Sequence, residues 1–185
     1  VFSAFGAECT LLDYSEVQCE TEKKVAEREN YKITVIRADM TQRLPFENES
    51  FDIVFYPVSN CYIENPEPVF SECFRILKTG GILLCGLDNG INFIFDETET
   101  TVKYSLPFNP LKDSELLRNA TEKNEGVQFS HTLDEQLGGQ LRSGFLITDL
   151  YEDTNGTGNL HEHGIPSFIA TRAVKPDFDI RKTYG

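Results

Sequence analysis

The stretch from residue 38 to residue 86 reads ADMTQRLPFENESFDIVFYPVSNCYIENPEPVFSECFRILKTGGILLCG, and it decides the fold. Residues 51–56 are aromatic and β-branched, which predicts a strand. An Asn-Pro pair at 65–66 predicts a helix start, apolar residues then recur at helical spacing, and Gly80 predicts the end of that helix. The continuous apolar run 82–87 predicts a strand covered on both faces. Strand, crossover helix and strand together make a βαβ unit.

The residues before this stretch continue the same alternation. Residues 9–13 read CTLLD, a short strand that ends in a carboxylate, and Ser15 begins a capping box that predicts a helix to about residue 30. Residues 33–36 predict the next strand, and residues 1–7 resemble the end of a helix. The chain therefore begins inside a β-α-β-α-β series.

After residue 86 the alternation of strands and helices becomes less regular. Polar residues over 97–124 predict an insertion with a short helix at 114–123. Thr132 begins a capping box for another helix. Leucines recur on that helix at a spacing of four: Leu133, Leu137 and Leu141. Residues 145–151 and 167–173 predict the last two strands.

Composition narrows the class of protein. With 185 residues and 39% hydrophobic content, the chain suits one domain with one core. A formal net charge of −13 argues against nucleic acid and favours a small molecule or a protein as substrate. We expect no membrane span, because no run approaches about 18 apolar residues, and no signal peptide. Five cysteines without short pairing motifs suit reduced thiols and a cytoplasmic protein.

In order and spacing over residues 11–86, these features resemble the class I S-adenosylmethionine-dependent methyltransferases of the type 11, ubiquinone-biosynthesis-like group. The resemblance lies in Asp39, Leu44-Pro45-Phe46, FDIV at 51–54 and RILKTGG at 75–81. It implies an α/β, three-layer, Rossmann-like fold whose sheet is mostly parallel with the last strand antiparallel. We expect residues 1–185 to form a single methyltransferase domain, from which the family's first strand and glycine-rich turn are missing.

The resemblance also implies residues that bind S-adenosylmethionine. Asp13, at the end of its strand, would accept the ribose hydroxyls, and Tyr14 would flank the adenine ring. Asp39 would accept a hydrogen bond from the adenine amino group, and the Met40 backbone N–H would meet a ring nitrogen. The alternatives are a strand-ending Asp13, an exposed Tyr14 and a turn-forming Asp39.

The segment after the central strand is expected to hold the reacting centre, where the methyl group would face its acceptor. It begins with three residues expected to contact the cofactor: Pro57, Val58 and Ser59. Many small-molecule relatives carry histidines after this strand, whereas this chain has Asn60, Cys61 and Tyr62. Asn60 and Tyr62 are therefore candidate catalytic residues. Nearby aromatic residues would suit a flat or apolar acceptor, although they also suit a core or lid: Tyr56, Tyr62, Phe93, Phe95 and Phe108.

A general base, if one is needed, is sought elsewhere. His161 and His163 lie in the loop between the last two strands, which opens on the same sheet edge. A solvated loop is the alternative, and we expect no metal because His-Glu-His lacks further obvious ligands. His131 precedes a capping box and is expected to be structural.

Two other functions remain open. A nicotinamide-dependent oxidoreductase shares the acidic residue after the second strand, but Lys103 and Tyr104 are adjacent rather than spaced along a helix. A non-enzymatic relative would keep the fold as an interaction module.

Overall fold

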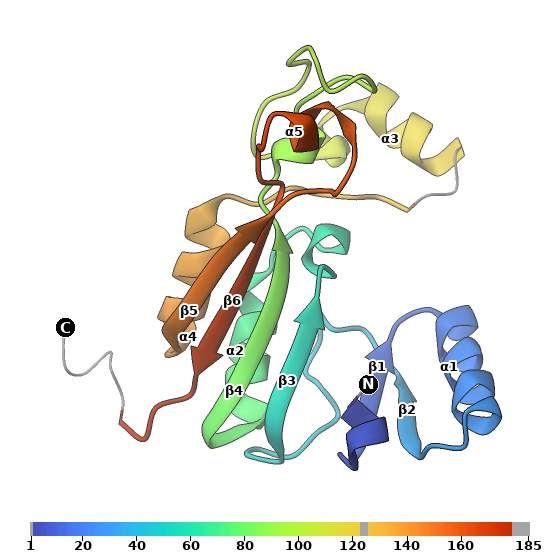
Figure 1. Ribbon diagram of the computed structural model, residues 1–185, viewed down its shortest axis with the longest axis vertical. Coiled ribbons are helices and arrows are strands. Elements are labelled where there is room, and N and C mark those ends of the chain that lie inside the picture. Colours follow the sequence, from blue (N-terminus) through green and yellow to red (C-terminus); the bar gives the residue numbers. More distant parts are fainter. Residues whose placement is uncertain (1, 123–125, 179–185) are drawn as a thin grey trace. The chain divides into compact units, whose positions relative to one another are not determined.

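The computed structural model describes residues 2–122 and 126–178, and the side chains of 119–122 lie outside that description (Figure 1). The chain divides into two compact units, Val1–Phe46 and Glu47–Gly185. Each unit has its own sheet and is considered by itself.

The first unit is a β-α-β element. Its strands β1 (Cys9–Asp13) and β2 (Ile33–Arg37) pair in parallel, and α1 (Glu16–Arg28) connects them. The predicted capping box is confirmed at its serine, since Ser15 Oγ accepts a hydrogen bond from the Gln18 backbone N–H at 3.3 Å. The chain start forms a 3₁₀ turn, η1 (Phe2–Phe5). The predicted strand, helix and strand are all confirmed.

The second unit contains a four-stranded sheet with helices and short turns. Its elements are β3 (Phe51–Pro57), η2 (Asn60–Tyr62), α2 (Glu67–Ile76), β4 (Leu77–Asp88), η3 (Ile91–Phe93), η4 (Pro110–Lys112), α3 (Ser114–Glu122), the π-helical η5 (Asp134–Gly138), α4 (Gly139–Ser143), β5 (Leu146–Asp153), α5 (Gly158–Glu162) and β6 (Phe168–Val174). The predicted short helix is α3, and residue 123 at its expected end lies outside the described residues.

The strand order in this sheet is β3-β4-β6-β5. β3 and β4 are parallel, whereas β6 lies between β4 and β5 and is antiparallel to both. The α/β class is confirmed. The sheet is mixed rather than mostly parallel, because the insertion of β6 between two strands creates two antiparallel ladders.

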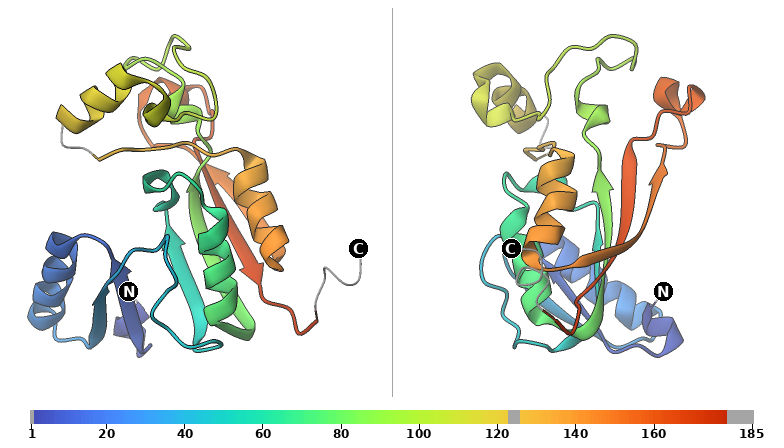
Figure 2. Two further views of the ribbon diagram at one scale, coloured as in Figure 1. Left: turned by 180° about the vertical axis from the view of Figure 1, so that it is seen from behind. Right: turned by 90° about the vertical axis from the view of Figure 1, so that its left-hand side faces the viewer.

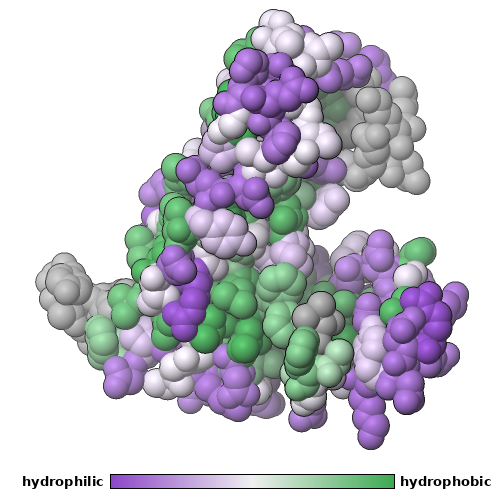
Figure 3. All heavy atoms as spheres, in the orientation of Figure 1, coloured by the Kyte–Doolittle hydropathy of each residue, from purple (hydrophilic) through white to green (hydrophobic). Residues whose placement is uncertain are grey.

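Helices α2 and α4 lie on one face of this sheet (Figure 2). Fully buried side chains form the core there, among them Phe70 of α2 and Leu83 of β4. The opposite face, turned toward the viewer in Figure 1, carries by its strand register partly exposed apolar side chains from the two edge strands: Ile53, Phe55 and Leu146. Figure 3 shows hydrophobic residues gathered over this face.

The predicted end of the crossover helix was wrong. Helix α2 ends at Ile76, not at Gly80, because the backbone from Leu77 onward joins the sheet. The Gly80 N–H donates to the Lys175 carbonyl at 2.8 Å, and the Lys175 N–H donates to the Gly81 carbonyl at 2.9 Å. Gly80, at a φ of 78°, permits the bend that these bonds require.

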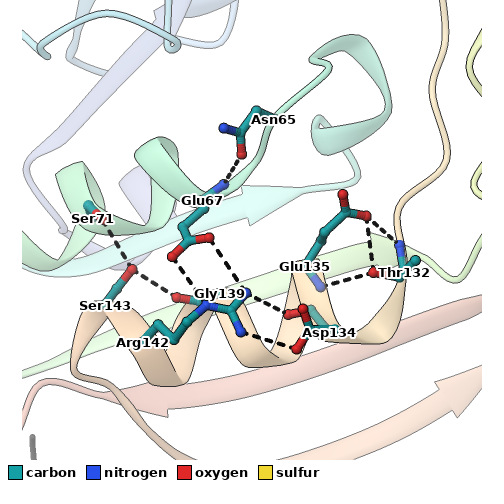
Figure 4. A network of polar contacts seen from close by, with 9 residues as sticks. All are labelled: Asn65, Glu67, Ser71, Thr132, Asp134, Glu135, Gly139, Arg142 and Ser143. Atoms are coloured by element: carbon teal, nitrogen blue, oxygen red, sulfur yellow. Dashed lines mark hydrogen bonds and ion pairs between the residues drawn. The ribbon is translucent and has the colours of Figure 1, made fainter.

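The helix after Thr132 has the predicted capping box but an unexpected buried face. Thr132 and Glu135 exchange the two reciprocal hydrogen bonds of that box, as Figure 4 shows. The leucine positions do not form the buried stripe, since Leu133 is 53% and Leu141 46% exposed. Polar and glycine residues face inward instead: Gln136, Gly139, Gln140 and Ser143.

Close packing against α2 explains this inward face. A Cβ on Gly139 would lie 3.0 Å from a ring carbon of Phe70, so any larger residue would press on that ring. At the solvent side of the contact, Arg142 forms ion pairs with Glu67 of α2 and with Asp134 (Figure 4). Tight contact, not a leucine stripe, therefore joins α4 to α2.

Candidate functional site

The carboxyl end of β3 has a strained backbone. Val58 adopts a φ of 45°, a left-handed conformation that β-branched residues rarely take. Its N–H donates to the Gly86 carbonyl of β4 at 2.7 Å, and its side chain lies over Gly86, where a Cβ would meet it at 3.3 Å. Such strain persists only where surrounding contacts enforce it, and it concentrates at functional sites. The predicted site segment 57–59 is therefore held firmly in place.

A buried polar network follows directly in η2. The fully buried Asn60 donates through Nδ2 to Gln136 Oε1 at 2.8 Å. Gln136 Nε2 in turn donates to the carbonyls of Asp88, at 2.8 Å, and His131, at 3.2 Å. Three segments distant in sequence therefore meet where β3 and β4 end, and one of them, which contains His131 and Gln136, was not among the loops expected at this sheet edge.

One atom of this network lacks a partner. Asn60 Oδ1 is buried, and no hydrogen-bond donor reaches it in the part of the chain that the structure describes. Buried acceptors are almost always paired, so an orphaned oxygen calls for an explanation. Gln136, which holds Asn60, belongs to the π-helical turn η5, and such turns are frequent at functional sites. The arrangement leaves an acceptor ready for a donor that a ligand brings.

Asp88 and Cys61 complete the surroundings of this network. Burial raises the pKa of the Asp88 carboxyl, while hydrogen bonds from the Asn92 side chain and the Gly90 N–H oppose that rise. Burial, with the nearby Asp88 charge, raises the pKa of the Cys61 thiol to about 11. Cys61 therefore stays protonated at neutral pH and does not serve as a thiolate nucleophile.

The predicted cofactor residues of the first unit lie in two turns after strands. Asp13 Oδ1 accepts the Ser15 N–H at 2.7 Å, and Asp39 Oδ1 accepts the backbone and hydroxyl of Thr41. Asp39 therefore forms a turn, as its alternative interpretation stated, and Asp13 ends β1. Within residues 2–122 and 126–178, no hydrogen bond involves the second oxygen of either carboxylate. Tyr14 is 71% exposed, and Met40 is half-buried.

The remaining candidates of the second unit are outside the buried network. Tyr62 is 56% exposed, and His161 and His163 are exposed in and after α5, where His161 Nδ1 pairs with the Thr154 hydroxyl. Their catalytic role stays a prediction. Tyr56, expected near the acceptor, is a buried side chain packed edge-on against Phe70.

Sequence reasoning missed Gln136 and gave His131 only a structural role. His131 is buried, and its Nε2 lies 2.9 Å from the Asn60 backbone oxygen. Among the described residues, no group of three or more potential metal ligands occurs. In that same part of the chain, no helix combines the length and apolar content that crossing a membrane requires.

Comparisons with known proteins agree with this fold. A family model described as "Methyltransferase domain" matches residues 1–85. The uncharacterized methyltransferase YbaJ of Bacillus subtilis (strain 168) is 37% identical over 182 residues, which cover 95% of this chain and 71% of YbaJ.

Solved structures show the same fold. The S-adenosylmethionine-dependent methyltransferase from Mesorhizobium loti superposes with a TM-score of 0.64 at 19% identity, covering 90% of this chain and 80% of that one. Geranyl diphosphate C-methyltransferase from Streptomyces coelicolor A3(2), in complex with Mg²⁺, geranyl diphosphate and S-adenosyl-L-homocysteine, gives 0.65 at 14% identity, covering 94% and 66%. The fold is that of the methyltransferases. By its similarity to YbaJ, the chain belongs to the methyltransferase family.

Proposed function

We propose that this protein transfers the methyl group of S-adenosylmethionine to a small-molecule acceptor. Membership of the methyltransferase family supports the reaction class. The observation from the structure that supports it most is the orphaned Asn60 Oδ1, which follows the strained Val58 at the end of β3. A ligand rich in N–H and O–H groups, as S-adenosylmethionine is, would supply the missing donor.

The residues present suit this cofactor. In the first unit, Asp13 and Asp39 each keep one carboxylate oxygen outside the turn bonds, which fits the proposed contacts to hydroxyl and amino groups. Tyr14 and Met40 remain proposed adenine contacts. In the second unit, the proposed contacts are the segment predicted from sequence: Pro57, Val58 and Ser59.

The cofactor supplies a methyl group that its sulfonium ion already activates. The protein's part is to align the acceptor, to exclude water and to accept a proton where the acceptor loses one. Asn60 is the proposed residue that positions the reacting groups, and Tyr62, His161 and His163 remain proposed contributors. The free cysteines support a further proposal, that the protein works in the reducing cytoplasm.

Binding of S-adenosylhomocysteine tests this proposal. Calorimetric titration of the protein expressed from its complete gene should give micromolar affinity. The variant Asp13→Ala should bind at least about tenfold more weakly, because a hydrogen bond to a charged group contributes about 1.5–3 kcal/mol.

The matched control is Glu20→Ala, which removes an exposed carboxylate of α1 that forms an ion pair with Lys23 on the helix surface. Its affinity should equal that of the unaltered protein. Equal affinity of all three proteins would refute the role of Asp13, and absence of binding by the unaltered protein would refute the proposed function.

A further inference from the structure

The second unit contains a cavity of about 150 Å³ next to the buried network. Its lining includes two phenylalanines and four groups that can form polar contacts: Glu64, Phe108, Lys112, Phe129, His131 and Glu135. A cavity of about this volume can hold one benzene molecule, so the space is large enough for a compound with one ring. Its mixed lining also offers polar partners.

The aromatic part of the lining is already organised as a stack. Phe108 stacks on Phe93 with a centroid separation of 5.5 Å and an interplanar angle of 23°. Tyr104 meets Phe108 edge-on at 5.4 Å. Phe129 is buried, and its backbone N–H donates to the Cys61 carbonyl at 2.7 Å. A flat ring in the cavity would contact faces and edges that are held in place before it arrives.

His131 is also part of this lining. The Asn60 carbonyl only accepts hydrogen bonds, so the 2.9 Å contact requires a proton on Nε2. In the neutral imidazole, Nδ1 then carries the lone pair, and no described residue forms a hydrogen bond with it. The buried network therefore fixes the tautomer and leaves one ring nitrogen able to take a proton.

The charges of the lining select against anions. Glu64 and Glu135 outnumber the single ammonium of Lys112. Each carboxylate uses one oxygen inside the protein: Glu64 Oε1 accepts from the Asn109 side chain, and Glu135 Oε2 accepts from Thr132. Among the described residues, no hydrogen bond involves Glu64 Oε2 or Glu135 Oε1, so these oxygens can accept from a ligand. A neutral donor suits this lining, whereas a carboxylate ligand would meet like charges.

From these observations we infer that the cavity binds the methyl acceptor, a neutral aromatic hydroxyl compound with one ring, and that His131 is its general base. The inference rests on the proposed function and names the substrate class. The acceptor oxygen forms a bond to the methyl carbon with its own electron pair. The carbon–sulfur bond breaks, and its pair stays on sulfur as a neutral thioether. The hydroxyl proton passes to Nδ1 of His131, which becomes an imidazolium.

Nuclear magnetic resonance of the histidine ring nitrogens tests this inference without any turnover. The chain has three histidines, so the variants His161→Gln and His163→Gln assign the His131 signals by elimination. The unliganded protein should show His131 protonated at Nε2 and not at Nδ1. Phenol, titrated as the probe, should shift the Nδ1 resonance of His131 in a saturable manner. Benzoate, which has the same ring and a negative charge, should leave it unchanged.

One variant of His131 distinguishes its proposed role as a base from its hydrogen bond to the Asn60 carbonyl. His131→Gln keeps an N–H group that can donate to the Asn60 carbonyl but removes the proton acceptor, and we expect about tenfold weaker phenol binding. The control Leu141→Gln changes an exposed side chain of α4 outside the cavity lining, and this variant should bind phenol as the unaltered protein does. Phenol binding that leaves Nδ1 unshifted, a proton on Nδ1 of the neutral ring, or equal binding of benzoate would overturn the inference.

The readouts also distinguish this inference from the proposed function. S-adenosylhomocysteine binding without a phenol effect on His131 overturns the acceptor assignment alone. A saturable phenol shift in a protein that does not bind S-adenosylhomocysteine upholds the cavity as a ring-binding site but refutes the proposed reaction.

Discussion

Replacing Gln136 with leucine is the most direct test of the buried network. The glutamine is fully buried and makes three hydrogen bonds through its side chain, to Asn60, Asp88 and His131. Leucine is similar in volume, so the change removes hydrogen bonds without opening a large cavity. At about 1 kcal/mol for each bond, the free energy of unfolding should fall by about 3 kcal/mol, because polar partners are left buried and unpaired.

Urea denaturation followed by circular dichroism measures this change. The control is the reverse substitution, Leu141→Gln, at a site on α4 where the leucine is 46% exposed. Glutamine and leucine have similar helix propensities, so the control should change the free energy of unfolding by no more than about 0.5 kcal/mol. A loss below about 1 kcal/mol for Gln136→Leu, or an equal loss for both variants, would refute the reasoning.

Further predictions concern packing and alkaline pH. Gly139→Ala should lower the free energy of unfolding by about 1–3 kcal/mol, because the added methyl group would press on the Phe70 ring. Thermal unfolding measures this change. A variant that is more stable than the unaltered protein would contradict the close packing of α4 on α2. Burial raises the pKa of Cys61 to about 11 and that of Cys73 to about 12, from an ordinary value of 9.0. Since the unfolded chain releases these protons first, the stability that the protonated thiols contribute is complete below pH 9 and is lost as the pH rises toward 11–12. The free energy of unfolding, measured by urea denaturation, should be lower at pH 10.5 than at pH 8, and this difference should be smaller in the variant Cys61→Ala. An equal free energy of unfolding at the two pH values would contradict the burial of these thiols.

The strands were predictable because their signals are local. The run at residues 51–56 is β-branched and aromatic, and it forms β3 almost as predicted. The end of α2 was not predictable in this way, since Gly80 has the features of a helix terminator. Its position in β4 depends on hydrogen bonds to Lys175, about 95 residues along the chain, which no local pattern reveals.

The candidate site likewise combines residues that local sequence signals identify with residues that only the folded chain brings together. Asn60 could be found because it follows a recognisable strand in a family-like order. Its partners Gln136 and His131 are more than 70 residues away, and only the folded chain brings them to it. The leucines around Gln136 suggested a buried apolar stripe, whereas the close approach that Gly139 permits turned a polar face inward. Tyr56 likewise looked like a site residue but faces the core.

The central claim is that this protein binds S-adenosylmethionine as its methyl donor. Its most direct test is a calorimetric titration of the unaltered protein with S-adenosylhomocysteine, followed by a separate titration with NADH. We predict micromolar binding of S-adenosylhomocysteine and no binding of NADH. Binding of NADH alone, or of neither compound, would contradict it.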